Sequence, residues 1–178
     1  MHPSLTQLVE AARSGRSGAF ATLVEELRPN IFQLTSRFSR TAPDFDDLSQ
    51  EICLRLWKSL PALRDSQAFL DWFRALAVRT CYDWLRRRRR RQDLEVPITG
   101  LELLPAVDSY NDAGRAAEIV HAALARLKPD ERLVLTLQEL EDHSIAEISK
   151  LTGWSESNVK VRAHRARAAL RQILLGGG

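Results

Sequence analysis

The chain has 178 residues, of which 44% are hydrophobic and 28% charged, and it is long enough to bury a hydrophobic core. No apolar run is long enough to span a membrane, and the N-terminus lacks the basic start and apolar stretch of a signal peptide. We therefore expect a cytoplasmic protein without direct membrane insertion. Two cysteines, Cys53 and Cys81, are too few for a disulfide framework and lack metal-ligand spacing, so we expect reduced packing residues.

The charge is distributed in three blocks. The net charge is only +3, yet residues 1–91 carry 16 Lys/Arg against 10 Asp/Glu, and residues 92–113 carry five Asp/Glu and no Lys/Arg. Residues 114–178 carry 10 Lys/Arg against 8 Asp/Glu, and most of that excess follows Gly153. Two basic regions separated by an acidic strip predict an anionic partner that is contacted at two places.

The apolar spacing is helical along most of the chain, and no segment has the alternation of a strand. In the first half we predict helices over residues 19–39, 44–59 and 67–91. Pro29 is expected to kink or restart the first of these, and Ser66 is a candidate N-cap of the third. Three tryptophans lie near the apolar stripes of these helices, and core packing is the expected role of Trp57, Trp72 and Trp84.

The second predicted helix contains the acidic stretch DFDDLSQEICLRLW. Its polar side would expose several acids and long polar side chains, namely Asp46, Asp47, Gln50, Glu51 and Arg55. Acids in such a position repel DNA, so this surface predicts a protein partner. A solvated helix face is the competing interpretation.

Six consecutive arginines, Arg86 to Arg91, end the third predicted helix. Because helical residues are spaced about 100° apart, only two to four of the six can contact one ligand. A solvated helix end, favoured by the negative end of the helix dipole, is the competing interpretation. Aromatic residues are interleaved with basic residues upstream of this run, at Phe69, Trp72, Arg74, Arg79 and Tyr82. Such a pattern suits melted or single-stranded nucleic acid, whose bases stack on aromatic rings.

Residues 92–113 contain two prolines and one glycine without a clean period, which predicts a flexible acidic linker. The predicted domains are therefore residues 1–91 and residues 114–178. In the second domain one helix is expected to bury a face made by Ala116, Ile119, Val120, Ala123, Leu124 and Leu127. A further helix is expected to begin at Pro129, which suits a first helical turn.

The C-terminal segment has the pattern of a helix-turn-helix. Ser144 and Glu147 form an S-x-x-E capping box, Gly153 ends the first helix, and Ser155 is the candidate N-cap of the second. The second helix would enter the major groove and place its basic side chains near phosphates or bases. An amphipathic helix with a solvated basic face is the competing interpretation, but residues 154–171 carry five Lys/Arg against one acid.

Catalysis is not expected from this sequence. It contains no Ser/His/Asp or Cys/His arrangement, no glycine-rich phosphate loop and no metal-ligand cluster, and its four histidines are scattered. We therefore expect no enzymatic activity, no cofactor, no metal and no small-molecule substrate.

Taken together and in this order, three segments resemble those of extracytoplasmic-function (ECF) sigma factors, the small two-domain class within the sigma-70 family of bacterial RNA polymerase subunits. DFDDLSQEICLRLW resembles the polymerase-binding stretch, FLDWFRALAVRTCYDWLRRRRRR the promoter-melting helix, and SIAEISKLTGWSESNVKVRAHRARAAL the −35-reading helix-turn-helix. The resemblance implies an all-α fold of two small helical domains. One binds polymerase and −10 DNA, the other is a C-terminal helix-turn-helix domain, and the flexible acidic linker would thread through the polymerase RNA channel.

The resemblance also implies roles for individual residues. Docking on the β′ clamp helices of core RNA polymerase is implied for Asp47, Leu48, Gln50 and Glu51. Contact with −10 DNA is implied for a base-capturing loop and the following helix, at Arg64, Asp65, Ser66, Gln67, Ala68, Arg79, Thr80, Asp83, Arg86 and Arg87. Contact with the −35 duplex is implied for Ser155, Glu156, Ser157, Asn158, Lys160, Arg162, His164 and Arg165. The family usually has Asn in place of Thr80 and Gly-Thr in place of Ser157-Asn158, so the promoter sequence is left open.

The implied function is promoter-specific transcription initiation, in which the −35 duplex is read and −10 DNA is melted and captured. The implied partners are core RNA polymerase, through its β′ clamp helices and β flap, promoter DNA and an anti-sigma factor. Such a factor is often membrane-anchored and can hold the protein at the inner membrane. The alternative is a stand-alone helix-turn-helix transcriptional regulator with an N-terminal partner-binding domain.

Overall fold

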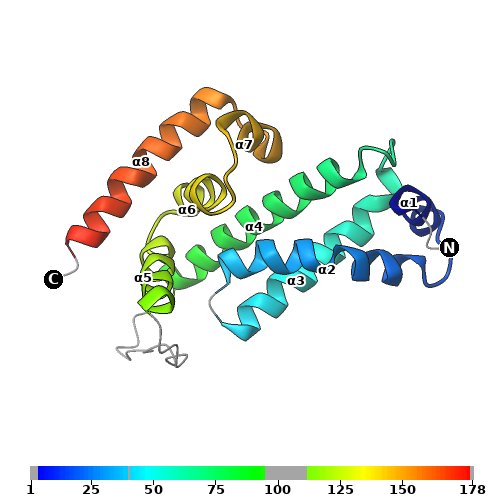
Figure 1. Cartoon of the computed structure of the whole chain (residues 1–178), viewed down its shortest axis with the longest axis horizontal. Helices are drawn as coiled ribbons and strands as arrows, with labels where there is room; N and C mark the ends of the chain where they lie inside the picture. Colours follow the sequence, from blue (N-terminus) through cyan, green and yellow to red (C-terminus); the bar gives the residue numbers. More distant parts are fainter. Residues whose placement is uncertain (1–3, 40, 95–111, 177–178) are drawn as a thin grey trace. The chain divides into compact units, whose positions relative to one another are not determined.

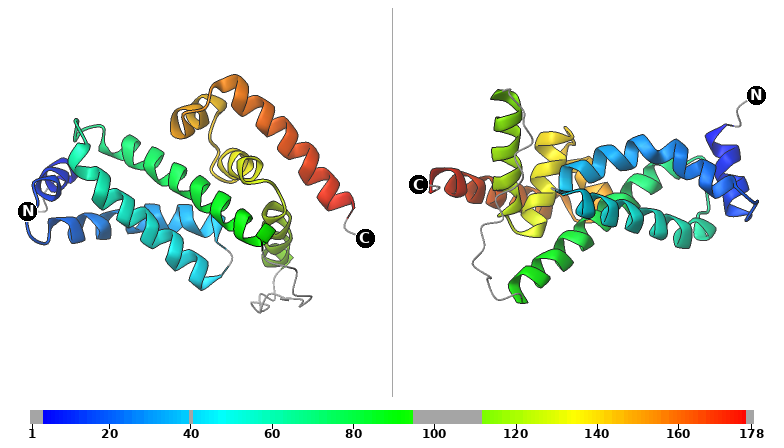
Figure 2. Two further views of the ribbon diagram at one scale, coloured as in Figure 1. Left: turned by 180° about the vertical axis from the view of Figure 1, so that it is seen from behind. Right: turned by 90° about the horizontal axis from the view of Figure 1, so that it is seen from below.

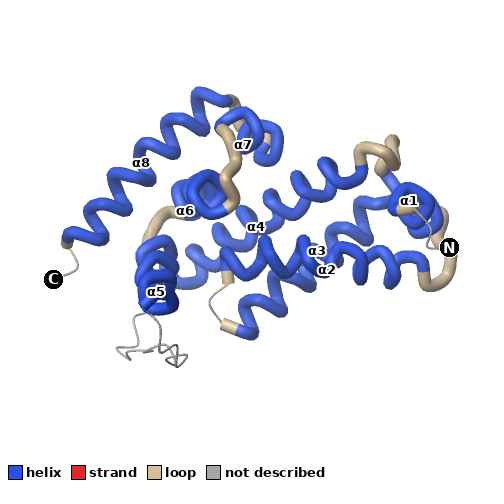
Figure 3. The backbone as a smooth tube through the Cα atoms, viewed as in Figure 1, coloured by secondary structure: helices blue, strands red, loops and turns tan. Residues whose placement is uncertain are grey.

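The computed structural model describes residues 4–39, 41–94 and 112–176, with side chains described from residue 118 onward in the last range. It divides into two compact units, residues 1–83 with 149–153 and residues 84–148 with 154–178. Helices form the regular structure, and no strand occurs in the described ranges (Figure 3). The predicted all-α class is therefore confirmed. Most of the predicted acidic linker, residues 92–113, lies outside the described residues.

The first unit begins with α1 (Leu5–Arg13), which packs on α2 (Ala19–Phe38) (Figure 1). A capping box starts α1, because the Ser4 hydroxyl accepts from the Gln7 backbone N–H and the Gln7 side chain accepts from the Ser4 backbone N–H. One face of α1 is buried, at Leu8, Val9 and Ala12. This helix was not among the elements predicted from the sequence.

Helix α2 runs without a break through Pro29, so the predicted restart does not occur. Proline removes one backbone donor, but Pro29 is exposed, and the carbonyl that loses its donor can bind water instead. Buried side chains at Leu23, Leu27 and Ile31 repeat at helical spacing and hold α2 in the core.

Helix α3 (Ala42–Ser59) lies beside α2 and is followed by the short helix η1 (Leu60–Ala62) (Figure 1, Figure 2). The Thr41 hydroxyl caps α3 by accepting from the Asp44 backbone N–H at 3.2 Å. The inner face of α3 is fully buried, at Leu48, Ile52 and Leu56.

Helix α4 (Phe69–Leu94) is a single helix of 26 residues that includes the whole arginine run. It begins three residues after Ser66, whose hydroxyl donates to Glu10 of α1. Ser66 is therefore not the N-cap of this helix, and that prediction is wrong.

The tryptophans do not share one environment. Trp84 is buried on α4 as predicted, and Trp72 is half-buried. Trp57 is 56% exposed on the outer side of α3, where its ring meets the edge of Phe20 at 4.7 Å between centroids. Core packing is thus the wrong prediction for Trp57, because the apolar stripe of α3 continues around the helix onto the surface.

The cysteines are both free, and Cys81 is buried in α4. Cys53 is half-buried in α3, and burial raises the pKa of its thiol, so the protonated form is favoured. Neither forms a disulfide in this structure. No helix in the described ranges is long and apolar enough to cross a membrane.

The second unit contains α5 (Asp112–Ala125), α6 (Pro129–Leu135), the π-helical turn η2 (Thr136–Leu140), part of α7 (Ile145–Thr152) and α8 (Glu156–Leu175). Helix α6 starts at Pro129, as predicted, and lies against α8 (Figure 1). A small core joins α5, α6 and α8 through Leu124, Leu127, Leu135 and Ala166. Ile119 and Val120 are exposed on α5, so the predicted apolar face is only partly buried.

The predicted caps and glycine turn are present at α7 and α8. The Ser144 backbone N–H donates to Glu147 at 2.8 Å, and the Glu147 backbone N–H donates to the Ser144 hydroxyl at 3.3 Å. Gly153 follows α7 with φ +81°, a conformation that favours glycine. The Ser155 hydroxyl then caps α8 by accepting from the Asn158 backbone N–H at 3.3 Å.

Candidate nucleic-acid and partner interfaces

The outer face of α3 combines acidic, amide and apolar side chains. Asp47, Gln50, Leu54 and Trp57 follow at intervals of three or four residues and so lie on one side of the helix. Asp47 and Gln50 are exposed, Leu54 is 51% exposed and Trp57 56%. A large aromatic beside an aliphatic residue and a polar rim is typical of a protein-binding surface, and the acid disfavours DNA. Leu54 and Trp57 were not predicted from the sequence as part of this face, although they continue the spacing of Asp47 and Gln50 along the helix.

Three charged residues connect this helix to α4. The Arg55 guanidinium lies 2.7 Å from the Asp83 carboxylate and 3.2 Å from that of Glu51. Glu51 and Asp83 had been assigned to different surfaces, one for polymerase and one for DNA. Arg55 joins the two helices that carry these surfaces. Because these side chains are partly exposed, the pairs fix orientation more than they add stability.

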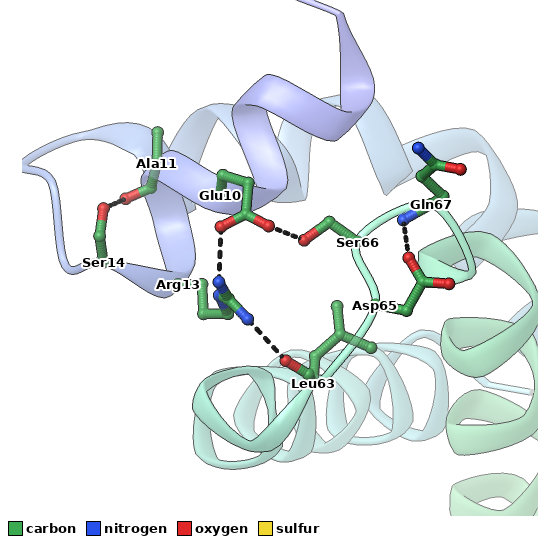
Figure 4. Close-up of polar contacts among 8 residues, drawn as sticks. All are labelled: Glu10, Ala11, Arg13, Ser14, Leu63, Asp65, Ser66 and Gln67. Carbon is green, nitrogen blue, oxygen red and sulfur yellow. Dashed lines mark hydrogen bonds and ion pairs between the residues drawn. The ribbon is translucent and has the colours of Figure 1, made fainter.

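The loop between η1 and α4 presents polar groups outward. Arg64, Asp65, Gln67 and Ala68 are exposed, and the Asp65 carboxylate accepts from the Gln67 backbone N–H at 2.8 Å (Figure 4). Ser66 points the other way and is 8% exposed. The loop predicted to capture a base therefore has an outer, accessible side and an inner, anchored side.

An exposed stripe runs along α4 beyond this loop. Arg79, Asp83 and Arg86 follow at i, i+4 and i+7 and share one side of the helix, with Arg87 at its edge. Arg79, Arg86 and Arg87 are exposed and Asp83 is half-buried. Two further arginines of the run point elsewhere, because Arg88 lies over the Trp84 ring at 5.2 Å and Arg89 pairs with Asp93 at 3.0 Å. Arg88 and Arg89 are thus engaged by other side chains of α4, and how many of the six arginines contact one ligand stays a prediction.

The outer face of α8 is polar, basic and accessible. Val159, Ala163 and Ala166 are buried, and at about 100° per residue the opposite side of the helix is centred near Val161. Except for Arg162, the predicted −35 residues are all exposed, namely Ser155, Glu156, Ser157, Asn158, Lys160, His164 and Arg165. Val161, which is 48% exposed between them, was not among the predicted contacts. An apolar side chain in that position can contact the methyl group of thymine.

Arg162 differs from the other basic residues of α8. Its guanidinium lies 3.1 Å from the Asp130 carboxylate of α6 and 4.2 Å from the centroid of the Trp154 ring. Its side chain is 24% exposed. These contacts hold Arg162 of α8 against Asp130 of α6 and the Trp154 ring.

Three of the predicted contact residues are buried. Leu48 and Thr80 have no exposed surface, and Ser66 retains 8%. The Thr80 hydroxyl donates to the Leu76 carbonyl at 2.7 Å, within its own helix. A buried side chain offers no surface to a partner, so in the conformation described these three pack inside the fold.

Comparison with known proteins identifies two segments of this chain. Residues 23–91 match the model of sigma-70 region 2, and residues 117–170 match that of sigma-70, region 4. The chain is 30% identical to the ECF RNA polymerase sigma factor SigM of Mycobacterium tuberculosis, over 96% of this chain and 85% of SigM.

Two solved structures are similar in fold. One is that of CnrH in complex with the cytosolic domain of CnrY, with a TM-score of 0.60 and 24% identity over 99% of this chain and 100% of that one. The other is the sigma factor RpoE in complex with the anti-sigma factor NepR from Bartonella quintana, with a TM-score of 0.58 and 21% identity over 84% of this chain and 94% of that one.

The similarity to SigM extends along nearly the whole chain, and the two matched regions follow in the order in which the sequence motifs occur. This extent favours a sigma factor over a stand-alone helix-turn-helix regulator. The chain belongs to the extracytoplasmic-function sigma factors of the sigma-70 family.

Proposed function

We propose that this protein directs core RNA polymerase to promoters by means of three separate surfaces. The proposal rests on one observation: the three surfaces of this sigma factor differ in their chemistry. The α3 face is acidic and apolar, the stripe on α4 is mainly basic, and the α8 face is basic with a polar N-terminal turn. The first suits a protein partner, and the other two suit nucleic acid.

Polymerase binding is assigned to the outer face of α3. The β′ clamp helices would be contacted by Asp47, Gln50, Leu54 and Trp57. Glu51 would support these residues from the side of the helix, and the buried Leu48 would support them from inside. The exposed acid would pair with basic groups of the partner, and the Trp57 ring would become buried on binding. Region 4 would contact the β flap.

Promoter recognition is divided between the other two surfaces. Arg64, Asp65, Gln67 and Ala68 would receive an unstacked base of the −10 element, and Arg79, Arg86 and Arg87 would contact the backbone of the melted strand. Helix α8 would enter the major groove of the −35 duplex with Ser157, Asn158, Lys160, Val161, His164 and Arg165. These steps bind and deform DNA, and the protein itself makes or breaks no covalent bond.

An anti-sigma factor is the proposed regulator. The structural similarity to RpoE in complex with the anti-sigma factor NepR supports this assignment. Such a factor would cover the polymerase and DNA surfaces and could retain the protein at the inner membrane, while the active protein works in the cytoplasm.

Reconstitution with core RNA polymerase tests the function. We expect the protein to co-elute with core polymerase and to support run-off transcription from promoters selected in vitro from randomised −35 and −10 positions. Core polymerase alone should give no such transcript. A protein that binds duplex DNA tightly by itself and never associates with core polymerase would falsify the proposal.

A further inference from the structure

Two side chains of α1 reach the base-capturing loop (Figure 4). Arg13 donates to the Leu63 carbonyl at 2.9 Å, and its second terminal nitrogen lies 2.8 Å from the Glu10 carboxylate. The other oxygen of that carboxylate accepts a hydrogen bond from the Ser66 hydroxyl. Glu10 and Arg13 therefore form one continuous bridge between Leu63 and Ser66, which we call the α1 clamp.

The α1 clamp touches only the inner side of the loop. Leu63 and Ser66, the two residues it holds, are 6% and 8% exposed. Arg64 and Asp65 stand between them and are exposed, so the polar side chains that face outward lie on a short segment fixed at both ends. The Asp65 carboxylate, which accepts from the Gln67 backbone N–H, fixes the next residues in turn.

The position of the clamp follows from the structure of α1. Burial of Leu8, Val9 and Ala12 sets the rotation of this helix, and Glu10 and Arg13 then lie one turn apart on a neighbouring side. Their side chains are 47% and 35% exposed, so neither is a core residue. Helix α1 precedes residues 23–91, the segment that matches sigma-70 region 2.

We propose that Glu10 and Arg13 are positioning residues for −10 recognition, because they hold the loop in the conformation that accepts a base. The inference rests on the proposed function of the loop. A loop that is ordered before DNA arrives loses less conformational entropy on binding, and its donors and acceptors are already directed at one base. The clamp should therefore sharpen the choice of base rather than add general affinity.

The test measures base discrimination by reconstituted holoenzyme. The probe is a fork-junction promoter DNA whose single-stranded −10 segment carries each of the four bases at each position in turn. For Glu10→Ala and for Arg13→Ala, we expect the affinity ratio between the preferred and the other bases to fall about three- to tenfold at the captured position. Affinity for core polymerase and for −35 duplex should stay unchanged.

Two further sets of variants separate positioning from a general effect on the fold. Glu25 and Arg28 form an ion pair of the same i, i+3 kind on the exposed side of α2, so Glu25→Ala and Arg28→Ala are matched controls and should leave discrimination unchanged. Arg13→Lys keeps the charge but lacks the forked donors, so it should restore discrimination only in part.

A double-variant cycle gives a second, independent readout. Ser66→Ala removes the hydroxyl while leaving a small buried side chain, and it should lower discrimination as much as Glu10→Ala does. Because both changes break the same hydrogen bond, the combined variant should lose little more than either alone.

The possible failures can be distinguished. Wild-type holoenzyme without any base discrimination in the −10 segment would reject the proposed function, and the clamp with it. Discrimination that is present in the wild type but unchanged in the clamp variants, additive losses in the cycle, or a parallel fall in affinity for core polymerase would reject the clamp alone.

Discussion

Arg162 and Arg165 lie three residues apart on α8 and have different surroundings. Arg162 pairs with Asp130 and stacks on Trp154, whereas Arg165 is exposed on the outer face of the helix. A guanidinium held by a carboxylate and an aromatic ring is less available to DNA than one facing solvent. The two arginines should therefore respond differently to removal.

Arg162→Ala is expected to lower the free energy of unfolding by about 1 kcal/mol, because an ion pair and a ring contact are lost together. Arg165→Ala should change stability by less than about 0.5 kcal/mol and weaken −35 binding about tenfold. Urea unfolding followed by circular dichroism measures the first effect, and holoenzyme binding to −35 duplex the second.

Each variant is the control for the other. Equal stability of the two proteins, with equal losses of DNA affinity, would show that Arg162 contacts DNA directly and that its internal contacts are incidental.

At the scale of single elements, α3 presents two different sets of apolar residues on opposite sides. Leu48, Ile52 and Leu56 fill the core, and Leu54 and Trp57 are exposed on the outer side. The Trp57 ring is supported by Phe20 of α2, which keeps it in place before a partner binds. An aromatic side chain that is already oriented contributes more binding energy per contact than one that must be ordered.

Trp57→Ala should weaken binding to core RNA polymerase at least about tenfold, since aromatic residues at the centre of an interface contribute most of its affinity. Lys58→Ala, at the next position of the helix and also exposed, should have a small effect. Fluorescence anisotropy of labelled protein titrated with core polymerase measures both. Unchanged affinity in Trp57→Ala would remove the α3 face from the polymerase interface.

Helical periodicity predicted most elements but not their exact functions. Ser144, Gly153 and Ser155 act locally, through caps and a left-handed turn, so their sequence spacing was sufficient. Trp57 was assigned to the core because periodicity gives the direction of an apolar stripe but not how far neighbouring helices cover it. Sequence spacing predicts a cap at Ser66, because the actual partner of its hydroxyl, Glu10, lies 56 residues away in the sequence.

Helix α1 differs from these residues, because the helix could have been predicted and only its contact with the loop could not. Ser4 and Gln7 form a capping box, and the apolar residues that follow Ser4 have helical spacing. The sequence therefore contains enough information to predict this helix. Its contact with the loop at Ser66 could not be predicted, because no local rule relates residues so distant in the chain.

At the scale of the whole molecule, the holoenzyme contacts DNA through many charges, and the number of phosphate contacts determines its salt dependence. Arg86 and Arg87 are exposed at one end of α4. Removing both should disturb the melted strand without altering the −35 sequence preference, which we assign to α8.

Arg86→Ala combined with Arg87→Ala should impair open-complex formation and reduce the slope of log affinity against log salt by about 1 to 2. The matched double variant, Arg88→Ala with Arg89→Ala, removes the same charge from the same run. It should change the slope less, because Arg88 lies over Trp84 and Arg89 pairs with Asp93. Equal slopes for the two double variants would show that net charge alone, rather than helical position, controls melting.

The uninterrupted course of α4 from Phe69 to Leu94 also fixes a distance. Arg86 follows Phe69 by 17 positions, which at a rise of 1.5 Å per residue is about 26 Å along the helix axis. If α4 lies along the DNA, its length sets the distance between the captured base and the part of the DNA backbone that the arginines contact. Point substitutions would leave that distance unchanged. Inserting one residue would lengthen the helix and turn the arginines by about 100° around its axis.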